Sequence, residues 1–201
     1  MVIKIALLAA KGGSSKTTTA VLLAASLHSL GEEAVVLDAD PQASALAWAE
    51  YATEHGTPLP FSVIPTGMEF PRKTPKDEQF VFLDTPPGDA EMIRAALKWA
   101  DLAILPTRPG AFDLLQLTPV LNAAEEIGTP AIVLIVQARA GVKETDQIQE
   151  ALADSHVATF QTQIPLRAAT SRLALNNPTA AELKASGYAE VAQEIKEAFS
   201  E

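Results

Sequence analysis

Short apolar runs alternate with longer Ala- and Leu-rich segments along the chain. The runs contain mainly β-branched and aliphatic residues and are short enough to be buried strands. We predict strands near residues 3–9, 34–38, 61–64, 80–84, 102–105, 131–136 and 157–163. Strands that alternate with helices are typical of right-handed crossovers between parallel strands. The pattern therefore predicts an α/β fold with a mainly parallel sheet of about seven strands, flanked by helices on both faces.

The segments between the runs have the lengths and end signals of helices. We predict helices near residues 20–30, 43–54, 90–99, 114–127, 143–154 and 179–199. Gly31 follows the first helix at a position where a C-cap glycine is common. The last segment carries an apolar stripe near helical spacing, which predicts core packing. The stripe consists of Leu183, Tyr188, Val191, Ile195 and Phe199.

Residues 65–79 interrupt this alternation. They contain three prolines and a small basic group, Arg72, Lys73 and Lys76. Because prolines and polar residues favour loops, we predict an exposed connection here. The basic group is either solvated or a contact for DNA or a partner protein, and the sequence leaves both open.

Composition narrows the class of protein. The 201 residues fit one α/β domain that spans residues 1–201. Hydrophobic residues make up 48% and aromatic residues only 5%, so the core must consist mostly of Ala, Val, Leu and Ile. The chain has no cysteine, which excludes disulfides, iron–sulfur ligation and thiolate catalysis. The first apolar segment is too short for a signal peptide or a membrane span, so we predict a cytoplasmic protein with no membrane partner.

The net charge of −10 argues against a standing nucleic-acid surface, which is usually basic. Any contact with DNA must come from a local patch, for example one that forms only in an oligomer. His28, His55 and His156 have no spacing typical of a metal site, and we interpret all three as structural.

The strongest chemical signal follows the first predicted strand, where a glycine turn leads into a helix. It consists of Lys11, Gly12, Gly13, Ser14, Ser15, Lys16, Thr17 and Thr18. In such a turn the backbone N–H groups converge on an anion, and the helix N-terminus adds partial positive charge. Lys16 would reach the β- and γ-phosphates, and the Thr17 hydroxyl would bind Mg²⁺. The alternative is a glycine-rich turn without a ligand.

Carboxylates end two of the predicted strands. Asp38 and Asp40 end or follow the strand at 34–38, and Asp84 ends the run at 80–84. The carboxyl ends of parallel strands form the ligand side of an α/β sheet, and an aspartate at the end of an apolar run commonly holds Mg²⁺. The alternative for Asp38 to Pro41 is an N-cap with the proline at the first position of the next helix.

Three strings, KGGSSKTT, DADPQ and DTPPG, occur in this order and resemble the deviant Walker A, switch I and switch II motifs of the ParA/MinD family of ATPases. The usual P-loop has glycines where Ala10 and Ser15 stand here. The family replaces the first of them regularly, so Ser15 is the departure. If this position needs a positive φ, a serine costs roughly 1–2 kcal/mol, and the hydrolysis rate depends on it.

The resemblance implies catalytic roles for Lys11, Lys16 and Asp40. Lys11 would cross to the partner's nucleotide in an ATP-sandwich dimer, and Lys16 would hold the phosphates of its own. Asp40 would position or activate the attacking water.

The resemblance also implies a metal set and a base contact. Thr17, Asp38 and Asp84 would support Mg²⁺. Gln137 and Arg139 fall where relatives contact the adenine base. The DTPPG backbone would sense the γ-phosphate.

Two further segments resemble the family. Residues 106–114 are similar to a PTxPxxxDL segment, which leads to the dimer face. The string at 164–167 resembles the segment before the last helices, where basic residues of the dimer touch DNA. Arg167, Arg172 and Lys184 are therefore candidate DNA-binding residues, with solvated surface cations as the alternative.

The resemblance covers nearly the whole chain and is greatest to small plasmid partition proteins of the ParA type. It implies an ATPase of weak intrinsic activity with ATP and Mg²⁺ as cofactors, which forms a homodimer on ATP binding and binds non-specific DNA. A centromere-binding partner protein would stimulate hydrolysis, and the protein would be associated with the nucleoid. Two alternatives stay open: a positioning ATPase for a protein cargo, and a binding module that has lost hydrolysis through Ser15.

Overall fold

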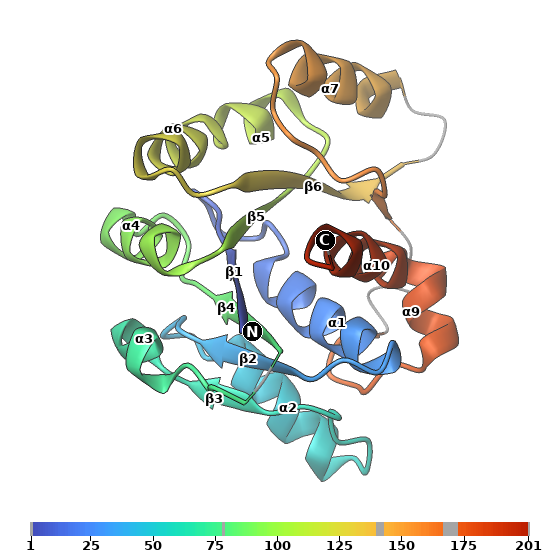
Figure 1. Ribbon diagram of the computed structural model, residues 1–201. Coiled ribbons are helices and arrows are strands. Elements are labelled where there is room, and N and C mark those ends of the chain that lie inside the picture. Colours follow the sequence, from blue (N-terminus) through green and yellow to red (C-terminus); the bar gives the residue numbers. More distant parts are fainter. Residues whose placement is uncertain (1, 78, 140–142, 167–172, 201) are drawn as a thin grey trace.

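The computed structural model describes residues 2–77, 79–139, 143–166 and 173–200 of the chain. In this part of the chain seven strands form a sheet in the order β3-β2-β4-β1-β5-β6-β7, and every neighbouring pair is parallel (Figure 1). The strands are β1 Ile3–Leu7, β2 Ala34–Asp38, β3 Val63–Pro65, β4 Phe80–Asp84, β5 Leu102–Thr107, β6 Ala131–Ala138 and β7 Ile164–Pro165. The predicted α/β class is confirmed.

Helices cover both faces of the sheet, as expected (Figure 1). They are α1 Lys16–Ser29, α2 Ser44–Glu54, α3 Phe70–Lys73, α4 Ala90–Trp99, α5 Ala111–Leu115, α6 Thr118–Ile127, α7 Lys143–Asp154, α9 Ala180–Ser186 and α10 Tyr188–Ala198. Helices α1, α2, α9 and α10 pack on one face, and α3, α4, α6 and α7 pack on the other. No helix among the described residues is both long and apolar enough to cross a membrane.

Successive strand residues point to opposite faces of the sheet, so each strand contributes side chains to two separate hydrophobic cores. In β1, Ile5 and Leu7 join the core under α1, whereas Ala6 joins the core under α4. Helix α1 is buried on all sides from Thr19 to Leu27 because the sheet, α2, α9 and α10 surround it, and Leu22 and Leu23 are completely buried. This buried helix holds the start of the functional site in place.

The predicted helix at 179–199 is wrong in one respect, because it is two helices. A capping box between Thr179 and Glu182 begins α9, and Gly187 separates α9 from α10 with a φ of 89°. A Cβ at Gly187 would lie 3.3 Å from the carbonyl oxygen of Gln163, so chain packing also favours glycine here. The predicted core stripe is confirmed from Leu183 to Ile195, and Phe199 packs against it partly buried.

The expectation of an exposed loop at 65–79 is also wrong in part. A 3-10 turn, Gly67–Glu69, leads into α3, and the Phe70 side chain is completely buried. Phe70 packs edge-on against Trp99 of α4, with ring centroids 5.5 Å apart. Arg72 and Lys73 are exposed at the end of α3, as predicted for the basic group.

Other boundaries also differ from the sequence-based expectation. The strands predicted at 3–9, 61–64, 102–105 and 131–136 are observed at 3–7, 63–65, 102–107 and 131–138. The predicted strand at 157–163 is wrong: this segment forms a single bridge between Val133 and Thr159, and the strand itself is only Ile164–Pro165. The predicted helix at 114–127 divides into α5 and α6, since Pro119 stands in the first turn of α6, where proline begins helices.

Candidate functional site

Four loops at the carboxyl ends of β2, β4, β1 and β5 lie side by side, because these strands are neighbours in the sheet. The strand register aligns Leu7 with Asp84 and Asp84 with Asp38. The two predicted carboxylate positions therefore lie next to each other and next to the loop that follows β1. The topology brings together the motifs that the sequence placed far apart.

The loop after β1 leads directly into α1, which begins at Lys16 and not at the predicted residue 20. The first turn of α1 contains no acidic residue, so no side chain of this turn neutralises the partial positive charge of its first N–H groups. Gly13 and Ser15 both have positive φ, 73° and 69°. Ser15 thus has the left-handed conformation that is costly for a residue with a Cβ.

The segment after β4 packs closely on this loop. The Gly88 amide donates to the Ala9 carbonyl at 3.2 Å, and a Cβ on Gly88 would lie only 2.9 Å from the Ala10 carbonyl oxygen. Glycine is required at position 88 by this close approach and by its φ of 70°. The DTPPG string therefore touches the backbone of the candidate phosphate loop.

Lys16 is a buried cation at the centre of the site, with 7% of its surface exposed. Burial lowers the pKa of Lys16, and the nearby carboxylates of Asp84 and Asp40 oppose this effect. Lys16 therefore connects the loop after β1 with the carboxylates that end β4 and follow β2. A desolvated cation at a helix N-terminus is well suited to phosphate oxygens.

Asp84 and Thr17 are paired beside Lys16. The Thr17 hydroxyl donates to Asp84 Oδ2 at 2.6 Å, whereas the buried Asp84 Oδ1 has no hydrogen-bond partner among the described residues. Burial raises the pKa of Asp84 to about 7. An orphaned carboxylate oxygen beside a hydroxyl fits the oxygen ligands of Mg²⁺. The buried Ser14 Oγ also lacks a hydrogen-bond partner in the described part of the chain, and it fits a phosphate oxygen.

The described residues contain no group of three or more His, Cys, Asp or Glu side chains that could hold a metal by themselves. A Mg²⁺ ion here would need phosphate oxygens and water as its remaining ligands. This is the usual coordination of Mg²⁺ with a nucleotide, because the ion keeps several of its waters.

Asp38 has a structural role in addition to its place in the site. Its Oδ2 accepts from the Leu46 amide at 2.9 Å and its Oδ1 from the Asp40 amide at 3.2 Å. Asp38 therefore caps the first turn of α2, and burial raises its pKa despite these bonds. The alternative with Pro41 at the first helical position is wrong, because α2 begins at Ser44. The Asp40 carboxylate accepts from the Gln42 amide at 2.9 Å and is half-buried.

Lys11 is paired with a residue that sequence reasoning did not single out. Its Nζ lies 2.6 Å from Asp113 Oδ1, on α5, and Arg108 approaches the same oxygen. Asp113 is the acidic residue of the segment that resembles PTxPxxxDL. This position in the motif is the sequence signal that could have identified it as a functional residue. In this structure Lys11 is therefore held in an ion pair within its own chain.

Gln137 and Arg139 differ in their surroundings. Gln137 has a φ of 57° at an irregularity in the pairing of β6 with β7, and its Nε2 donates to Ser15 Oγ at 3.4 Å. It therefore contacts the loop after β1 itself, whereas Arg139 is exposed. Of the candidate DNA-binding residues, Lys184 is exposed on α9, and Arg167 and Arg172 lie outside the described residues.

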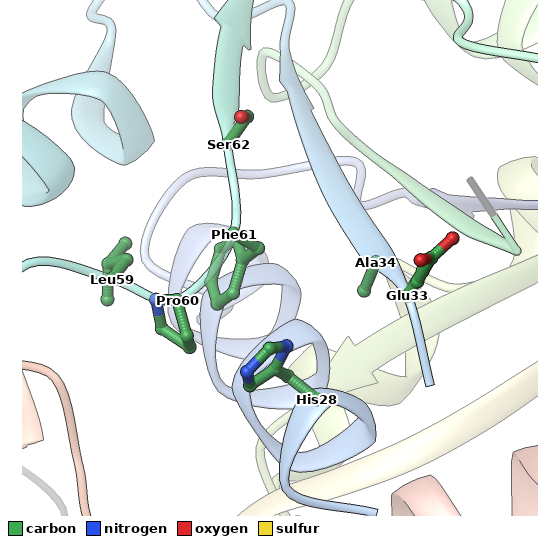
Figure 2. Close-up of a pocket in the computed structure, with 7 residues that line it drawn as sticks. All are labelled: His28, Glu33, Ala34, Leu59, Pro60, Phe61 and Ser62. Carbon is green, nitrogen blue, oxygen red and sulfur yellow. The ribbon is translucent and has the colours of Figure 1, made fainter. Parts of the chain in front are cut away.

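A separate hollow of about 490 Å³ lies at the other end of α1. Figure 2 shows its lining, with the His28 ring at the last turn of α1 facing the segment that leads to β3. His28 stands twelve positions after Lys16 in α1, which is roughly 18 Å along the helix axis. This hollow is therefore not part of the site at the strand ends.

Several known proteins are similar to this chain in sequence or in fold. Residues 5–180 match the family described as the CobQ/CobB/MinD/ParA nucleotide binding domain. The chain is 35% identical over 175 residues to the maintenance of carboxysome distribution protein A of Gloeobacter kilaueensis. This match covers 85% of this chain and 80% of that protein. It is 31% identical over 154 residues to the chromosome-partitioning ATPase Soj of Thermus thermophilus, covering 62% of each.

Among solved structures, the fold is similar to a putative plasmid partition protein of Borrelia burgdorferi bound to AMPPNP. The TM-score is 0.75 at 17% identity, and the match covers 98% of this chain and 100% of that one. The family match includes the loop after β1 and both acidic strand ends. The chain therefore belongs to the CobQ/CobB/MinD/ParA nucleotide-binding family, as its three motifs predicted.

Proposed function

We propose that this chain is a ParA-type ATPase that positions a cargo by binding DNA in its ATP state. ATP and Mg²⁺ bind at the loop after β1, two copies then form a homodimer, and the dimer binds DNA without sequence preference on the nucleoid. A partner protein stimulates hydrolysis and so releases the dimer. The observation that supports this proposal most is the cluster of Lys16, Thr17 and Asp84 at the open N-terminus of α1.

In this proposal the chain acts mainly by electrostatics and positioning. Lys16 and the N–H groups of the loop hold the phosphates, and Thr17 with Asp84 holds the Mg²⁺ ion, which would neutralise charge on the phosphate oxygens. Asp38 supports this shell and keeps α2 in place. Asp40, close enough to Lys16 to affect its pKa, positions the attacking water.

The role of Lys11 requires a change from the state described here. In the proposed dimer its ammonium group reaches the nucleotide of the partner, so the ion pair with Asp113 must open first. Slow intrinsic hydrolysis follows from this arrangement, because one subunit alone lacks the second lysine at its phosphates.

The cargo divides the proposal into two candidates. Similarity to a chromosome-partitioning ATPase supports DNA as the cargo. The longer match, over 85% of this chain, is to a protein that maintains carboxysome distribution, and it supports a protein compartment as the cargo. Purified partners would separate them: a centromere-binding protein that stimulates hydrolysis supports the first, and stimulation only by an adaptor of a protein assembly supports the second.

A gel shift on DNA of arbitrary sequence tests the common part. We expect a shift with ATP and Mg²⁺, little or none with ADP, and a loss of the shift as salt rises, because the contacts would be to phosphates. Equal binding in both nucleotide states would contradict the proposal. Single-turnover hydrolysis with and without the partner tests the remaining alternative, since a chain that never hydrolyses ATP, even as Ser15→Gly, is a binding module.

A further inference from the structure

We propose that Arg108 is a positioning residue that takes over the Asp113 carboxylate when Lys11 leaves it. This inference rests on the proposed function, in which Lys11 moves to a nucleotide bound by a second copy. It assigns to Arg108 a part in the ATP-dependent step without any contact with the phosphates.

Two cations share one oxygen at this position. Lys11 Nζ lies 2.6 Å from Asp113 Oδ1, and Arg108 Nε lies 3.8 Å from the same atom. Asp113 is held close to the backbone, because a Cβ on Gly110 would lie 2.8 Å from its Oδ2. The Asp113 side chain is only 19% exposed, so water can replace a lost partner only in part.

The Arg108 Nε has no hydrogen-bond acceptor among the described residues although the atom is buried. A buried N–H donor without an acceptor is unusual and destabilising. Its Nη2 lies 4.0 Å from where a Cβ on Gly13 would stand, an ordinary van der Waals distance, and its Nε lies 3.8 Å from Asp113 Oδ1. The nearest anion for the orphaned Nε is therefore Asp113.

Departure of Lys11 would leave this largely buried carboxylate without its close partner, which is unfavourable because water solvates it only in part. Arg108 needs to approach by only about 1 Å to reach hydrogen-bond distance. Its guanidinium is always charged and binds carboxylates through two parallel N–H groups. Arg108 thus satisfies both its own donor and Asp113, and lowers the free energy needed to release Lys11.

A double-mutant cycle tests this role. The wild type, Arg108→Gln, Asp113→Asn and the double variant are compared by analytical ultracentrifugation for dimer formation with ATP and Mg²⁺, and by titration for the affinity of the monomer for ADP. We expect Arg108→Gln to weaken dimer formation about tenfold, which is the effect of about 1.4 kcal/mol, and to leave ADP affinity unchanged.

In the Asp113→Asn background the same Arg108→Gln change is expected to have no further effect, because no carboxylate then needs a partner. Arg108→Lys keeps the charge but loses the planar pair of N–H donors, so it is expected to restore dimer formation only in part. Arg94→Gln is the matched control: Arg94 is paired with Glu126 on the surface, away from the site, and its loss should not alter dimer formation.

Several results would overturn the inference. One is an undiminished defect of Arg108→Gln in the Asp113→Asn background, and another is a loss of ADP affinity, since either places Arg108 on the phosphates. Normal dimer formation by Arg108→Gln would also contradict it. A wild-type chain that stays monomeric at saturating ATP would instead refute the proposed function, and this inference with it.

Discussion

Two residues of the candidate site are held in conformations or ionisation states that cost free energy. Ser15 has a φ of 69°, and the buried Asp84 Oδ1 has no hydrogen-bond partner among the residues that the structure describes. Both lie on the loop or strand end where we place the triphosphate and Mg²⁺. Strain and desolvation at these residues are consistent with a site whose full set of contacts requires a ligand.

Ser15→Gly should stabilise the free protein slightly. Glycine removes roughly 1–2 kcal/mol of strain from the left-handed conformation of the folded state. Its greater conformational freedom in the unfolded chain lowers stability by about 0.4–1 kcal/mol. We expect a net gain of roughly 0.5–1 kcal/mol in the free energy of unfolding, measured by urea denaturation. Ser44→Gly, at the first position of α2, is the control and should not gain stability.

Asp84 predicts a pH dependence of stability in the absence of Mg²⁺ and nucleotide. Its pKa rises from 3.8 to about 7, so the folded state favours the protonated form. The associated stabilisation is complete below pH 3.8 and is lost as the pH rises to about 7. Over this range the wild type should lose up to roughly 4 kcal/mol relative to Asp84→Asn. A difference between the two proteins that does not vary with pH would contradict the assignment.

Lys16 and Lys11 should separate nucleotide binding from dimer formation. Lys16→Ala removes the buried cation and should abolish ATP binding, as measured with a fluorescent analogue. Lys11→Ala should still bind nucleotide, because Lys11 is paired with Asp113 and not with Asp84 or Asp40, the carboxylates near Lys16. The variant should not form the ATP-dependent dimer in sedimentation. Unchanged ATP affinity in Lys16→Ala would contradict the phosphate assignment.

At the scale of elements, α1 and α10 connect the site to the last part of the chain. The Thr19 hydroxyl, one turn into α1, is 3.2 Å from the Tyr188 hydroxyl at the start of α10, and both side chains are buried. The Trp48 indole on α2 donates to the Asn176 carbonyl at 2.9 Å. The orientation of α9, which carries Lys184, therefore depends on the break before α10.

Gly187→Ala tests this junction. Gly187 and Gly31 have nearly the same φ, 89° and 84°, but a Cβ meets the Gln163 carbonyl oxygen at 3.3 Å in the first case and nothing within 4 Å in the second. Gly31→Ala should cost about 1 kcal/mol from the backbone alone. Gly187→Ala should cost about 1 kcal/mol more, as measured by thermal unfolding. Equal losses would show that the junction tolerates a side chain.

At the scale of the whole molecule, the net charge of −10 is the main obstacle to binding DNA. A dimer can still present a local basic patch, and exposed Lys184 is the described candidate for it. We expect Lys184→Ala to weaken ATP-dependent DNA binding severalfold and to reduce its salt dependence, measured by fluorescence anisotropy. Lys98→Ala, in the last turn of α4 on the other face of the sheet, should have no such effect.

Much of the fold could be predicted because its signals are local. The strands at Ala34–Asp38 and Phe80–Asp84 and the helices at Ala90–Trp99 and Lys143–Asp154 have the predicted bounds. The misses at Phe70, Thr159 and Gly187 have a common cause. Each depends on a contact with a distant segment, and such contacts override the local preferences of the chain.

The sequence by itself determined the class of site: a glycine turn between strand and helix, followed in order by acidic strand ends, is a short-range pattern that the backbone must satisfy locally. Only the tertiary structure decided which side chains meet there. Gln137 contacts Ser15, 122 residues away in the sequence. Asp113 pairs with Lys11, and the Arg108 Nε lies 3.8 Å from the same oxygen. These contacts follow from the order of strands in the sheet, because that order determines which segments lie beside the loop after β1. The periodicity of apolar residues along the chain does not encode the strand order.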